Sequence, residues 1–337
     1  MAVKVAINGF GRIGRLVLRA IVESGRDDVE VVAINDLGSV EANAHLFRYD
    51  SVHGRFPGKV TVSGDMITIH HNNRQYGPIR VSAEREPAKV PYQGVDVAME
   101  CTGRFTTKDQ ASALIAAGAR RVLISAPADG VDATVVFGVN HKVMTKEMTV
   151  VSNASCTTNC LVPMVKVLHD AFTIERGYML TCHSYTGDQH TVDTLHKDLH
   201  RARAAGVSMI PTSTGAAKAV GLVMPELKGK LDGTSIRVPT PNVSVISLDV
   251  VLTKKPTRDE INAAMKAATE GSLKGIMDYN TAPLVSADFI HCPASCTFDA
   301  PQTAVVDGAL FRVLGWYDNE WGFSNRMSDT AALLGSL

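Results

Sequence analysis

The residues of this chain that could do chemistry begin with the segment SNASCTTNC, which contains Cys156 and Cys160. The apolar run that follows, 161–172, has helical spacing, and Asn153 and Ser155 are suitable N-caps for that helix. Cys156 then lies in the first turn, where unpaired N–H groups and the helix dipole lower the pKa of a thiol. Cys156 is therefore a candidate nucleophile. The alternative is that both cysteines are small buried residues at a helix start.

A histidine follows in the next strand pattern. Residues 178–189 read YMLTCHSYTGDQ, and the strand run ends with His183. A reactive thiol together with a histidine implies covalent catalysis on a carbonyl group.

Three arginines point to an anionic substrate. Arg201 and Arg203 lie in the long polar segment 190–206, which could also be a solvated basic loop, and Arg237 lies near the start of an extended pattern over 232–252. Another anion-binding position precedes a predicted helix, at Thr214 and Gly215 in the segment 211–221. Arginines and helix ends of this kind imply a phosphorylated substrate.

The first elements of the chain predict a dinucleotide site. A buried strand pattern, 3–8, meets the glycine turn GFGRIG and a helix over 15–24, and a second strand, 29–36, ends in Asp36. In this fingerprint Gly9 allows the tight turn, Gly11 lets the backbone approach a pyrophosphate, and Gly14 lets helix and strand pack closely. Asp36 accepts from a ribose hydroxyl and repels a 2′-phosphate, which favours NAD over NADP. A nicotinamide takes hydride, so the predicted reaction is oxidation of an aldehyde through a thioester.

The remaining pattern predicts two domains. Strands over 95–103 and 120–127, with a helix over 107–119 between them, continue an α/β alternation that stops after a strand at 146–155. Alternating runs such as 303–319 then suggest a largely antiparallel sheet. The expected fold is a Rossmann-type doubly wound parallel sheet plus an α+β catalytic domain with a mainly antiparallel sheet.

Bulk composition excludes several classes of protein. The 337 residues are 45% hydrophobic and 20% charged, with a formal net charge of zero, so nothing favours nucleic acid or a membrane as the main partner. No apolar segment is long enough to span a bilayer and no cleavable signal precedes the first strand, which leads us to expect a cytoplasmic protein. The six cysteines are expected to be free thiols, without a metal.

With these residues in place, the chain resembles the phosphorylating glyceraldehyde-3-phosphate dehydrogenases of the bacterial type. The resemblance rests on INGFGRIGR, SNASCTTNC, HSYTGDQ, STGAAKAVG, RVPTPNVSV and WYDNEWGFSNRM, and it runs from end to end. It implies oxidative phosphorylation of D-glyceraldehyde 3-phosphate to 1,3-bisphosphoglycerate with NAD as the cofactor. Cys156 would form the thioester, while His183 exchanges protons at a pKa near the working pH and forms an ion pair that keeps Cys156 ionised.

The resemblance also implies binding roles. The attacking phosphate would contact Ser155, Thr157, Thr214, Gly215 and Arg201, with Arg203 close enough to compete for the last role. The phosphate of the substrate would contact Thr186, Asp188 and Arg237. The cofactor would contact Asn8, Gly9, Gly11, Arg12, Ile13, Asp36, Arg85, Ser125 and Asn319.

The resemblance further implies a domain division and an assembly. The NAD-binding domain would span 1–154, with the C-terminal helix 320–337 returning to it, and the catalytic domain 155–319. Members are homotetramers in which a loop, here roughly 181–206, reaches toward the neighbouring subunit. Two alternatives stay open, an erythrose-4-phosphate dehydrogenase and a non-enzymatic NAD-binding scaffold or sensor. Cys182 is either a small apolar filler or a second redox thiol.

Overall fold

The computed structural model describes residues 2–337, and the chain divides into two compact units. The first unit comprises the residues up to Phe137 together with His141–Ser155 and Ser324–Leu337. The second unit comprises Gly138–Asn140 and Cys156–Phe323.

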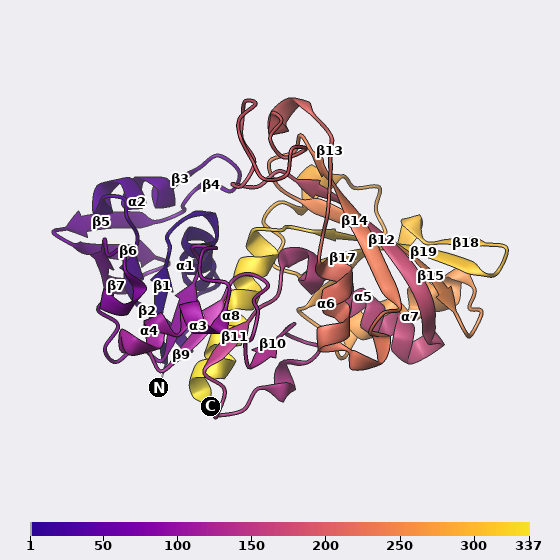
Figure 1. The fold of residues 1–337 in the computed structure, drawn as a ribbon, viewed down its shortest axis with the longest axis horizontal. Helices are drawn as coiled ribbons and strands as arrows, with labels where there is room; N and C mark the ends of the chain where they lie inside the picture. Colours follow the sequence, from indigo (N-terminus) through magenta and orange to yellow (C-terminus); the bar gives the residue numbers. More distant parts are fainter. Residues whose placement is uncertain (1) are drawn as a thin grey trace. The chain divides into compact units, whose positions relative to one another are not determined.

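A nine-stranded sheet forms the centre of the first unit, in the order β10-β11-β9-β8-β1-β2-β7-β6-β5 (Figure 1). Adjacent strands from β10 to β7 are parallel, and β5, β6 and β7 pair antiparallel at one edge. The strands are β1 (Val3–Asn8), β2 (Val29–Asn35), β5 (Lys59–Ser63), β6 (Met66–His71), β7 (Arg74–Ser82), β8 (Val97–Glu100), β9 (Arg121–Ile124), β10 (Ala133–Thr134) and β11 (Val150–Ser152). A small separate sheet pairs β3 (Tyr49–Asp50) with β4 (Gly54–Arg55). This order confirms the predicted Rossmann-type fold.

The helices of this unit include the two that were predicted between strands, one of them in altered form, and one helix, α2 (Val40–Arg48), that was not predicted. They are α1 (Arg12–Ser24), α2 (Val40–Arg48), α3 (Lys108–Ala111), α4 (Ala113–Ala116) and most of α8 (Trp321–Ser336). The prediction of one helix over 107–119 is wrong, because the segment forms two short helices that meet at Ser112. The Ser112 hydroxyl donates to the Lys108 carbonyl at 2.7 Å, and such a bond competes with the regular helix ladder.

An eight-stranded sheet organises the second unit, with the path β13-β14-β12-β15-β19-β17-β16 and β18 beside β19 (Figure 1). Its strands are β12 (Ile174–Ser184), β13 (Ile210–Thr212), β14 (Leu231–Val238), β15 (Ser244–Leu252), β16 (Met277–Asn280), β17 (Cys296–Asp299), β18 (Ala304–Val306) and β19 (Leu310–Tyr317). All pairings are antiparallel except β12 with β14 and β16 with β17. The mainly antiparallel catalytic sheet is confirmed.

The extended pattern over 232–252 is interrupted. It forms two strands, β14 and β15, because Pro239 and Pro241 lack the N–H groups that a continuous ladder needs. Val243 has a φ of +68° and completes the turn. The long segment after β12 is irregular, as expected, except for short elements near its end.

Helix α5 (Cys156–Phe172) packs against β12, β15, β17 and β19 and contacts α6 (Ala216–Val223) and α7 (Arg258–Glu270). The predicted apolar face of α5 is fully buried: Leu161, Met164, Val165 and Leu168 have no exposed surface. Burial of this face anchors the helix, so its N-terminal residue, Cys156, has a defined position against the sheet.

The register of β12 against β14 brings distant residues together. In this parallel pair His183 lies opposite Arg237, although 53 residues separate the two in the chain. On the other side of β12, Cys182 lies opposite Val245 of β15. A slip of one residue would send His183 to the opposite face of the sheet.

We predict that Asp132 stabilises the first unit in a pH-dependent manner. Its carboxylate accepts from the Thr149 and Val150 N–H groups at 2.8 and 2.9 Å and pairs with Lys108, and these contacts lower its pKa to about 2, against the effect of burial. Asp132→Asn should therefore lower the free energy of unfolding at pH 7 by about 2 kcal/mol, measured by urea denaturation.

The folded-state pKa lies below the unfolded value, so this stabilisation is complete above about pH 5 and is lost as the pH falls toward 2. The control is Asp65→Asn, which removes an ion pair with Arg80 whose side chains are both more than half exposed. It should change the stability by less than about 0.5 kcal/mol. Equal effects of the two substitutions would contradict the prediction.

Candidate functional site

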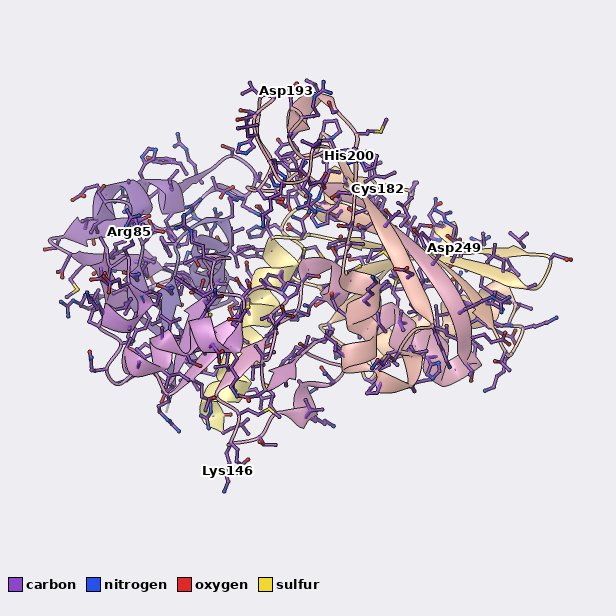
Figure 2. The ribbon with its side chains drawn as sticks, viewed as in Figure 1. Arg85, Lys146, Cys182, Asp193, His200 and Asp249 are labelled. Atoms are coloured by element: carbon purple, nitrogen blue, oxygen red, sulfur yellow. The ribbon has the colours of Figure 1, made fainter. Side chains whose placement is uncertain are left out.

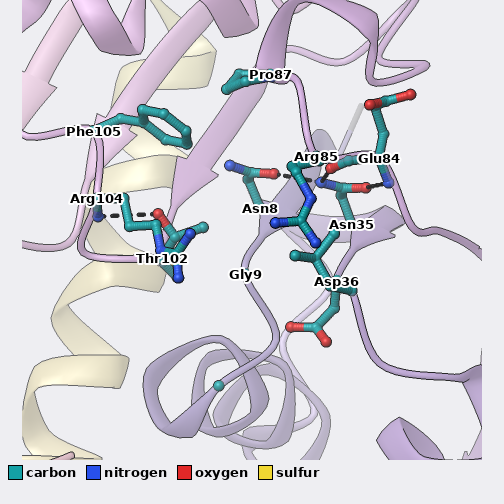
Figure 3. A pocket seen from close by; sticks show the side chains of 13 residues that line it. Asn8, Gly9, Asn35, Asp36, Glu84, Arg85, Pro87, Thr102, Arg104 and Phe105 are labelled. Atoms are coloured by element: carbon teal, nitrogen blue, oxygen red, sulfur yellow. Dashed lines mark hydrogen bonds between the residues drawn. The ribbon is translucent and has the colours of Figure 1, made fainter.

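The first unit contains a cavity of about 280 Å³ where the sequence predicted a dinucleotide site. It lies at the carboxyl ends of β1, β2 and β8, where the strand order reverses, which is the usual ligand site of such sheets. In Figure 3 the labelled side chains of Asn35, Glu84 and Arg85 gather on one side of Gly9, and those of Thr102, Arg104 and Phe105 on the other. The lining residues are Asn8, Gly9, Gly11, Asn35, Asp36, Leu37, Glu84, Arg85, Pro87, Cys101, Thr102, Arg104 and Phe105.

The three glycines of the turn have separate physical roles. Gly9 has a φ of +92°, and a Cβ there would lie 2.7 Å from the Thr102 backbone nitrogen. A Cβ on Gly14 would lie 2.1 Å from the Gly9 carbonyl oxygen, so this position packs helix against turn. A Cβ on Gly11 would meet no atom within 4 Å, although Gly11 lines the cavity. The open space above Gly11 fits a pyrophosphate at the N-terminus of α1.

The Asp36 carboxylate holds the glycine turn. It accepts from the Phe10 N–H at 2.8 Å through one oxygen and from the Gly38 N–H at 2.9 Å through the other. Each oxygen keeps a lone pair, so Asp36 can still accept from a ribose hydroxyl.

The other predicted cofactor residues are distributed unevenly. Asn8 and Arg85 line the cavity, whereas Arg12, Ile13 and Ser125 do not. The Arg12 guanidinium pairs with Asp50, and Arg12 opposes the effect of burial so that the pKa of Asp50 falls to about 2.

Several lining residues were not singled out from the sequence. They are Asn35, at the end of β2, and residues in the loops after β2, β7 and β8, which include Glu84, Thr102 and Phe105. The available signal was their position directly after parallel strands.

The second unit brings the candidate nucleophile and base together. Cys156 Sγ lies 3.5 Å from Nε2 of His183, which is only 4% exposed. His183 Nδ1 lies 2.7 Å from the Ser184 carbonyl oxygen. A carbonyl oxygen only accepts, so the proton belongs on Nδ1 and the Nε2 lone pair faces the thiol. This tautomer makes His183 a base for Cys156.

The protonation states correct two expectations. The pKa of His183 is not near neutral: burial and the charge of Arg237 lower it to about 3. The pKa of Cys156 is raised rather than lowered, because burial outweighs the Arg237 charge and the hydrogen bonds of Thr157. Both pKa directions favour a neutral thiol beside a neutral imidazole over the expected ion pair.

A cluster of charged and hydroxyl groups adjoins His183. Arg237 Nη1 lies 3.0 Å from His183 Nδ1, and it shares the Ser184 carbonyl oxygen with that group by donating to it at 3.0 Å. Arg237 Nη1 also donates to Thr186 Oγ1 at 3.2 Å. Thr186 in turn donates to Asp188, whose other oxygen pairs with Arg201 at 2.7 Å. The structure thus joins Arg201 to the predicted anion site.

Arg203 lies outside this cluster. Its side chain is 66% exposed and pairs with Asp193. Figure 2 shows Asp193 and His200 in the loop between β12 and β13.

Tyr317 is a site residue that sequence reasoning missed. Its ring packs edge-on against His183 at 5.8 Å, and its hydroxyl bonds to Thr157 at 3.0 Å and Thr181 at 2.9 Å. These contacts hold Thr157 and the imidazole on one side of Cys156. The available signal was the position of Tyr317 in the motif WYDNEWGFSNRM, because the alternating pattern of the strand that it ends gives no indication of this role.

The remaining predicted residues occupy defined positions. Asn319 Oδ1 accepts from Ser184 Oγ and Ser244 Oγ, each at 2.9 Å, which orients its amide group. Thr214 Oγ1 accepts from the Ala216 N–H at 3.2 Å, and Gly215 is the N-cap of α6. Ser155 directly precedes Cys156.

All six cysteines are free thiols, as expected. Cys182, labelled in Figure 2, is partly exposed and burial raises its pKa, which does not favour a redox thiol. Among residues 2–337 no group of three or more His, Cys, Asp or Glu side chains is placed to hold a metal ion. In the same residues no helix is long and apolar enough to cross a membrane.

A dinucleotide cavity and a thiol–imidazole pair in one chain define a class, the NAD-dependent dehydrogenases that act through a cysteine. Family comparison agrees. The family model described as "Glyceraldehyde 3-phosphate dehydrogenase, NAD binding domain" matches residues 3–108, and the model for the "C-terminal domain" matches residues 155–319. The chain belongs to the glyceraldehyde-3-phosphate dehydrogenase family, and its cofactor is NAD.

Curated relatives cover the whole chain. A glyceraldehyde-3-phosphate dehydrogenase of Xanthobacter flavus is 67% identical over 339 residues, which is 100% of both chains. That of Cereibacter sphaeroides is 64% identical, again over 100% of both. That of Geobacillus stearothermophilus is 54% identical over 100% of this chain and 99% of its own.

The glycine turn offers a test of the cofactor cavity. Gly11→Ala should leave the fold intact, because its Cβ meets no protein atom, yet weaken NAD binding about tenfold or more by filling the approach to the pyrophosphate. Gly14→Ala should lower the melting temperature, because its Cβ would overlap the Gly9 carbonyl oxygen. Calorimetric NAD titration and thermal unfolding separate the two effects, and parent-like NAD affinity in Gly11→Ala would refute the assignment.

The charge of Arg237 offers a second test. That charge lowers the pKa values of both Cys156 and His183, so both should rise in Arg237→Gln. Alkylation of Cys156 by iodoacetamide at pH 7 should then slow severalfold, because a smaller fraction of the thiol is ionised. Arg203→Gln is the control, since this exposed side chain pairs with Asp193 and lies outside the cluster around His183. Equal alkylation rates in the two variants would contradict the prediction.

Proposed function

We propose that this chain catalyses the NAD-dependent oxidative phosphorylation of D-glyceraldehyde 3-phosphate to 1,3-bisphosphoglycerate. The observation that carries the proposal is the Cys156–His183 pair, at 3.5 Å, beside the Arg237 cluster. The pair supplies a nucleophile for an aldehyde, and the cluster supplies cationic groups for phosphate. The full-length relatives named glyceraldehyde-3-phosphate dehydrogenase support this substrate.

The first step forms a bond between Cys156 Sγ and the aldehyde carbon. His183 Nε2 takes the thiol proton as Sγ attacks and returns it to the new alkoxide, which gives a thiohemiacetal. The Cys156 N–H at the start of α5, with His183, stabilises the developing negative charge.

The second step is oxidation. NAD, when bound, accepts the hydride that leaves the thiohemiacetal carbon. His183 removes the hydroxyl proton at the same time, so the carbon becomes the thioester carbonyl. The lowered pKa of His183 favours the neutral imidazole that this step needs as its base.

The third step releases the product. An oxygen of inorganic phosphate attacks the thioester carbon and the C–S bond breaks. The His183 imidazolium returns its proton to Sγ, which restores the neutral pair and leaves the acyl phosphate.

Two groups of residues bind the phosphates in this proposal. Thr186, Asp188 and Arg237 bind the phosphate of the substrate; the hydrogen bond between Arg237 and Thr186 supports this grouping. Ser155, Thr157, Thr214, Gly215 and Arg201 bind the attacking phosphate. Asp188 lies between Arg201 and Arg237 and offsets their mutual repulsion.

The cofactor residues stay as inferred from the sequence. Asp36 accepts from a ribose hydroxyl. Because Oδ1 of Asn319 accepts from Ser184 and Ser244, its Nδ2 group is oriented to donate a hydrogen bond to the cofactor. The full group is Asn8, Gly9, Gly11, Arg12, Ile13, Asp36, Arg85, Ser125 and Asn319, of which Arg12 would contribute its backbone N–H because its side chain pairs with Asp50.

The domain division and the assembly are also part of the proposal. We assign 1–154 and the C-terminal helix 320–337 to NAD binding and 155–319 to catalysis, supported by a change of compact unit between Ser155 and Cys156. We also infer a cytoplasmic homotetramer. In its support, the loop after β12 exposes large apolar side chains, among them Leu195 at 95% and Val207 at 82%, that a neighbouring subunit would cover.

One assay separates the proposed reaction from its alternatives. NADH formation from glyceraldehyde 3-phosphate should require phosphate or arsenate, because the thioester is released by phosphate attack. Phosphate-independent turnover of erythrose 4-phosphate would instead indicate the erythrose-4-phosphate enzyme, and no turnover of either aldehyde would indicate a scaffold or sensor.

Cys156→Ser should lower the oxidation rate about a thousandfold or more while NAD binding persists, because a serine hydroxyl is a far weaker nucleophile beside the same imidazole. Cys182→Ser is the matched control and should keep nearly the parent rate. Retained activity in Cys156→Ser would refute the nucleophile.

A further inference from the structure

A buried chain of hydrogen bonds runs beneath the cofactor cavity, and its first member, Glu100, has no role in the chemistry above. Glu100 is 1% exposed. One oxygen accepts from the Thr102 N–H at 2.8 Å and from the Thr102 hydroxyl, and the other accepts from Asn8 Nδ2 at 2.5 Å. Burial raises the pKa of Glu100, and these hydrogen bonds oppose the rise by favouring the carboxylate.

The chain continues across the carboxyl ends of the neighbouring strands. Asn8 Oδ1 accepts from Asn35 Nδ2 at 2.9 Å, and the same Nδ2 donates to the Glu84 carbonyl at 2.9 Å. Asn35 Oδ1 accepts from the Glu84 N–H at 2.8 Å and from Ser82 Oγ at 2.9 Å. Figure 3 shows the links from Asn8 through Asn35 to Glu84.

This chain has a direction. At its far end the Glu84 N–H only donates, so Asn35 must present Oδ1 there and Nδ2 to Asn8. Asn8 must then present Oδ1 to Asn35 and Nδ2 to residue 100. Only an acceptor at position 100 satisfies every member, and a carboxylate has no donor to present in the wrong place.

Both ends of this chain of hydrogen bonds lie at the walls of the cavity. Thr102 and Glu84 line it, as do Asn8 and Asn35 between them. Thr102 also abuts Gly9, because a Cβ on Gly9 would lie 2.7 Å from the Thr102 nitrogen. The chain therefore ties the glycine turn to the Glu84–Arg85 segment on the opposite wall.

We propose that Glu100 is a positioning residue for NAD, which acts by polarising the Asn8–Asn35 amide chain that clamps the Glu84 segment. The inference rests on the proposed placement of NAD in this cavity. It assigns Glu100 no contact with the cofactor.

Glu100→Gln tests it with a nearly isosteric change. The new amide presents a donor to Asn8, both asparagines must turn over, and the Glu84 N–H loses its acceptor. In the NAD-free protein, exchange of the Glu84 amide hydrogen should accelerate about tenfold, measured by mass spectrometry on a peptide spanning 80–90. The dissociation constant for NAD, measured by calorimetry, should rise about tenfold, while kcat at saturating NAD stays within about twofold.

The matched control is Glu30→Gln, an exposed glutamate on β2, which should match the parent in all three measurements. A rescue variant, Glu100→Gln with Asn8→Asp, moves the carboxylate one link along the chain. The introduced carboxylate accepts from both neighbours, so Asn35 keeps its orientation and slow exchange at Glu84 should return. No rescue of the exchange rate would refute the directional chain.

The outcomes distinguish this inference from the proposed reaction. Parent-like exchange at Glu84 in Glu100→Gln overturns the inference whatever happens to NAD affinity. Faster exchange with unchanged NAD affinity overturns the link between Glu100 and the cofactor. It leaves the placement of NAD and the Cys156 chemistry standing, because these are measured separately by the Gly11→Ala titration and the phosphate-dependent assay.

Discussion

The contact between Cys156 Sγ and His183 Nε2 requires a helix and a strand of the second unit to be placed correctly at the same time. Neither residue creates it alone. Burial of one face of α5 places the thiol, and the register of β12 against β14 places the imidazole opposite Arg237. The Ser184 carbonyl then selects the tautomer that points a lone pair at sulfur. Loss of any of these conditions leaves a partly exposed thiol and a buried imidazole that no longer act as a pair.

Burial favours a neutral Cys156–His183 pair, and the Arg237 charge reinforces this preference at His183. An ion pair would need the imidazole to gain a proton in a buried place beside the Arg237 guanidinium, and both effects oppose this. Burial likewise disfavours the thiolate form of Cys156 and raises the pKa of its thiol. Arg237 thus favours the charge on sulfur and disfavours the charge on His183, so its position suits an anionic intermediate and a neutral base.

In the first unit the main constraint is the close approach of the α1 backbone to the backbone of the glycine turn. Gly14 permits the helix to touch the turn, and Gly11 leaves open space where a ligand can reach the N–H groups. Asp36 and the buried amide chain from Glu100 then hold this geometry with hydrogen bonds. Polar groups here are buried but satisfied, so they order the cavity instead of weakening the fold.

The spacing of residue types along the sequence determined much of the local structure of this protein. The glycine turn, the buried strands and the apolar face of α5 follow from spacing along the chain, because each depends on neighbours within a few residues. Family motifs also indicated Cys156 and His183. The hydrophobic pattern did not predict the break at Ser112 or the turn between β14 and β15. These depend on a side-chain hydrogen bond and on prolines, which interrupt regular backbone hydrogen bonding. Only the tertiary structure decided the protonation states, the part of Tyr317 and the direction of the amide chain under the cavity. These three features depend on burial and on contacts between residues of distant strands. The spacing of residues along one strand does not indicate which residues of another strand lie beside it.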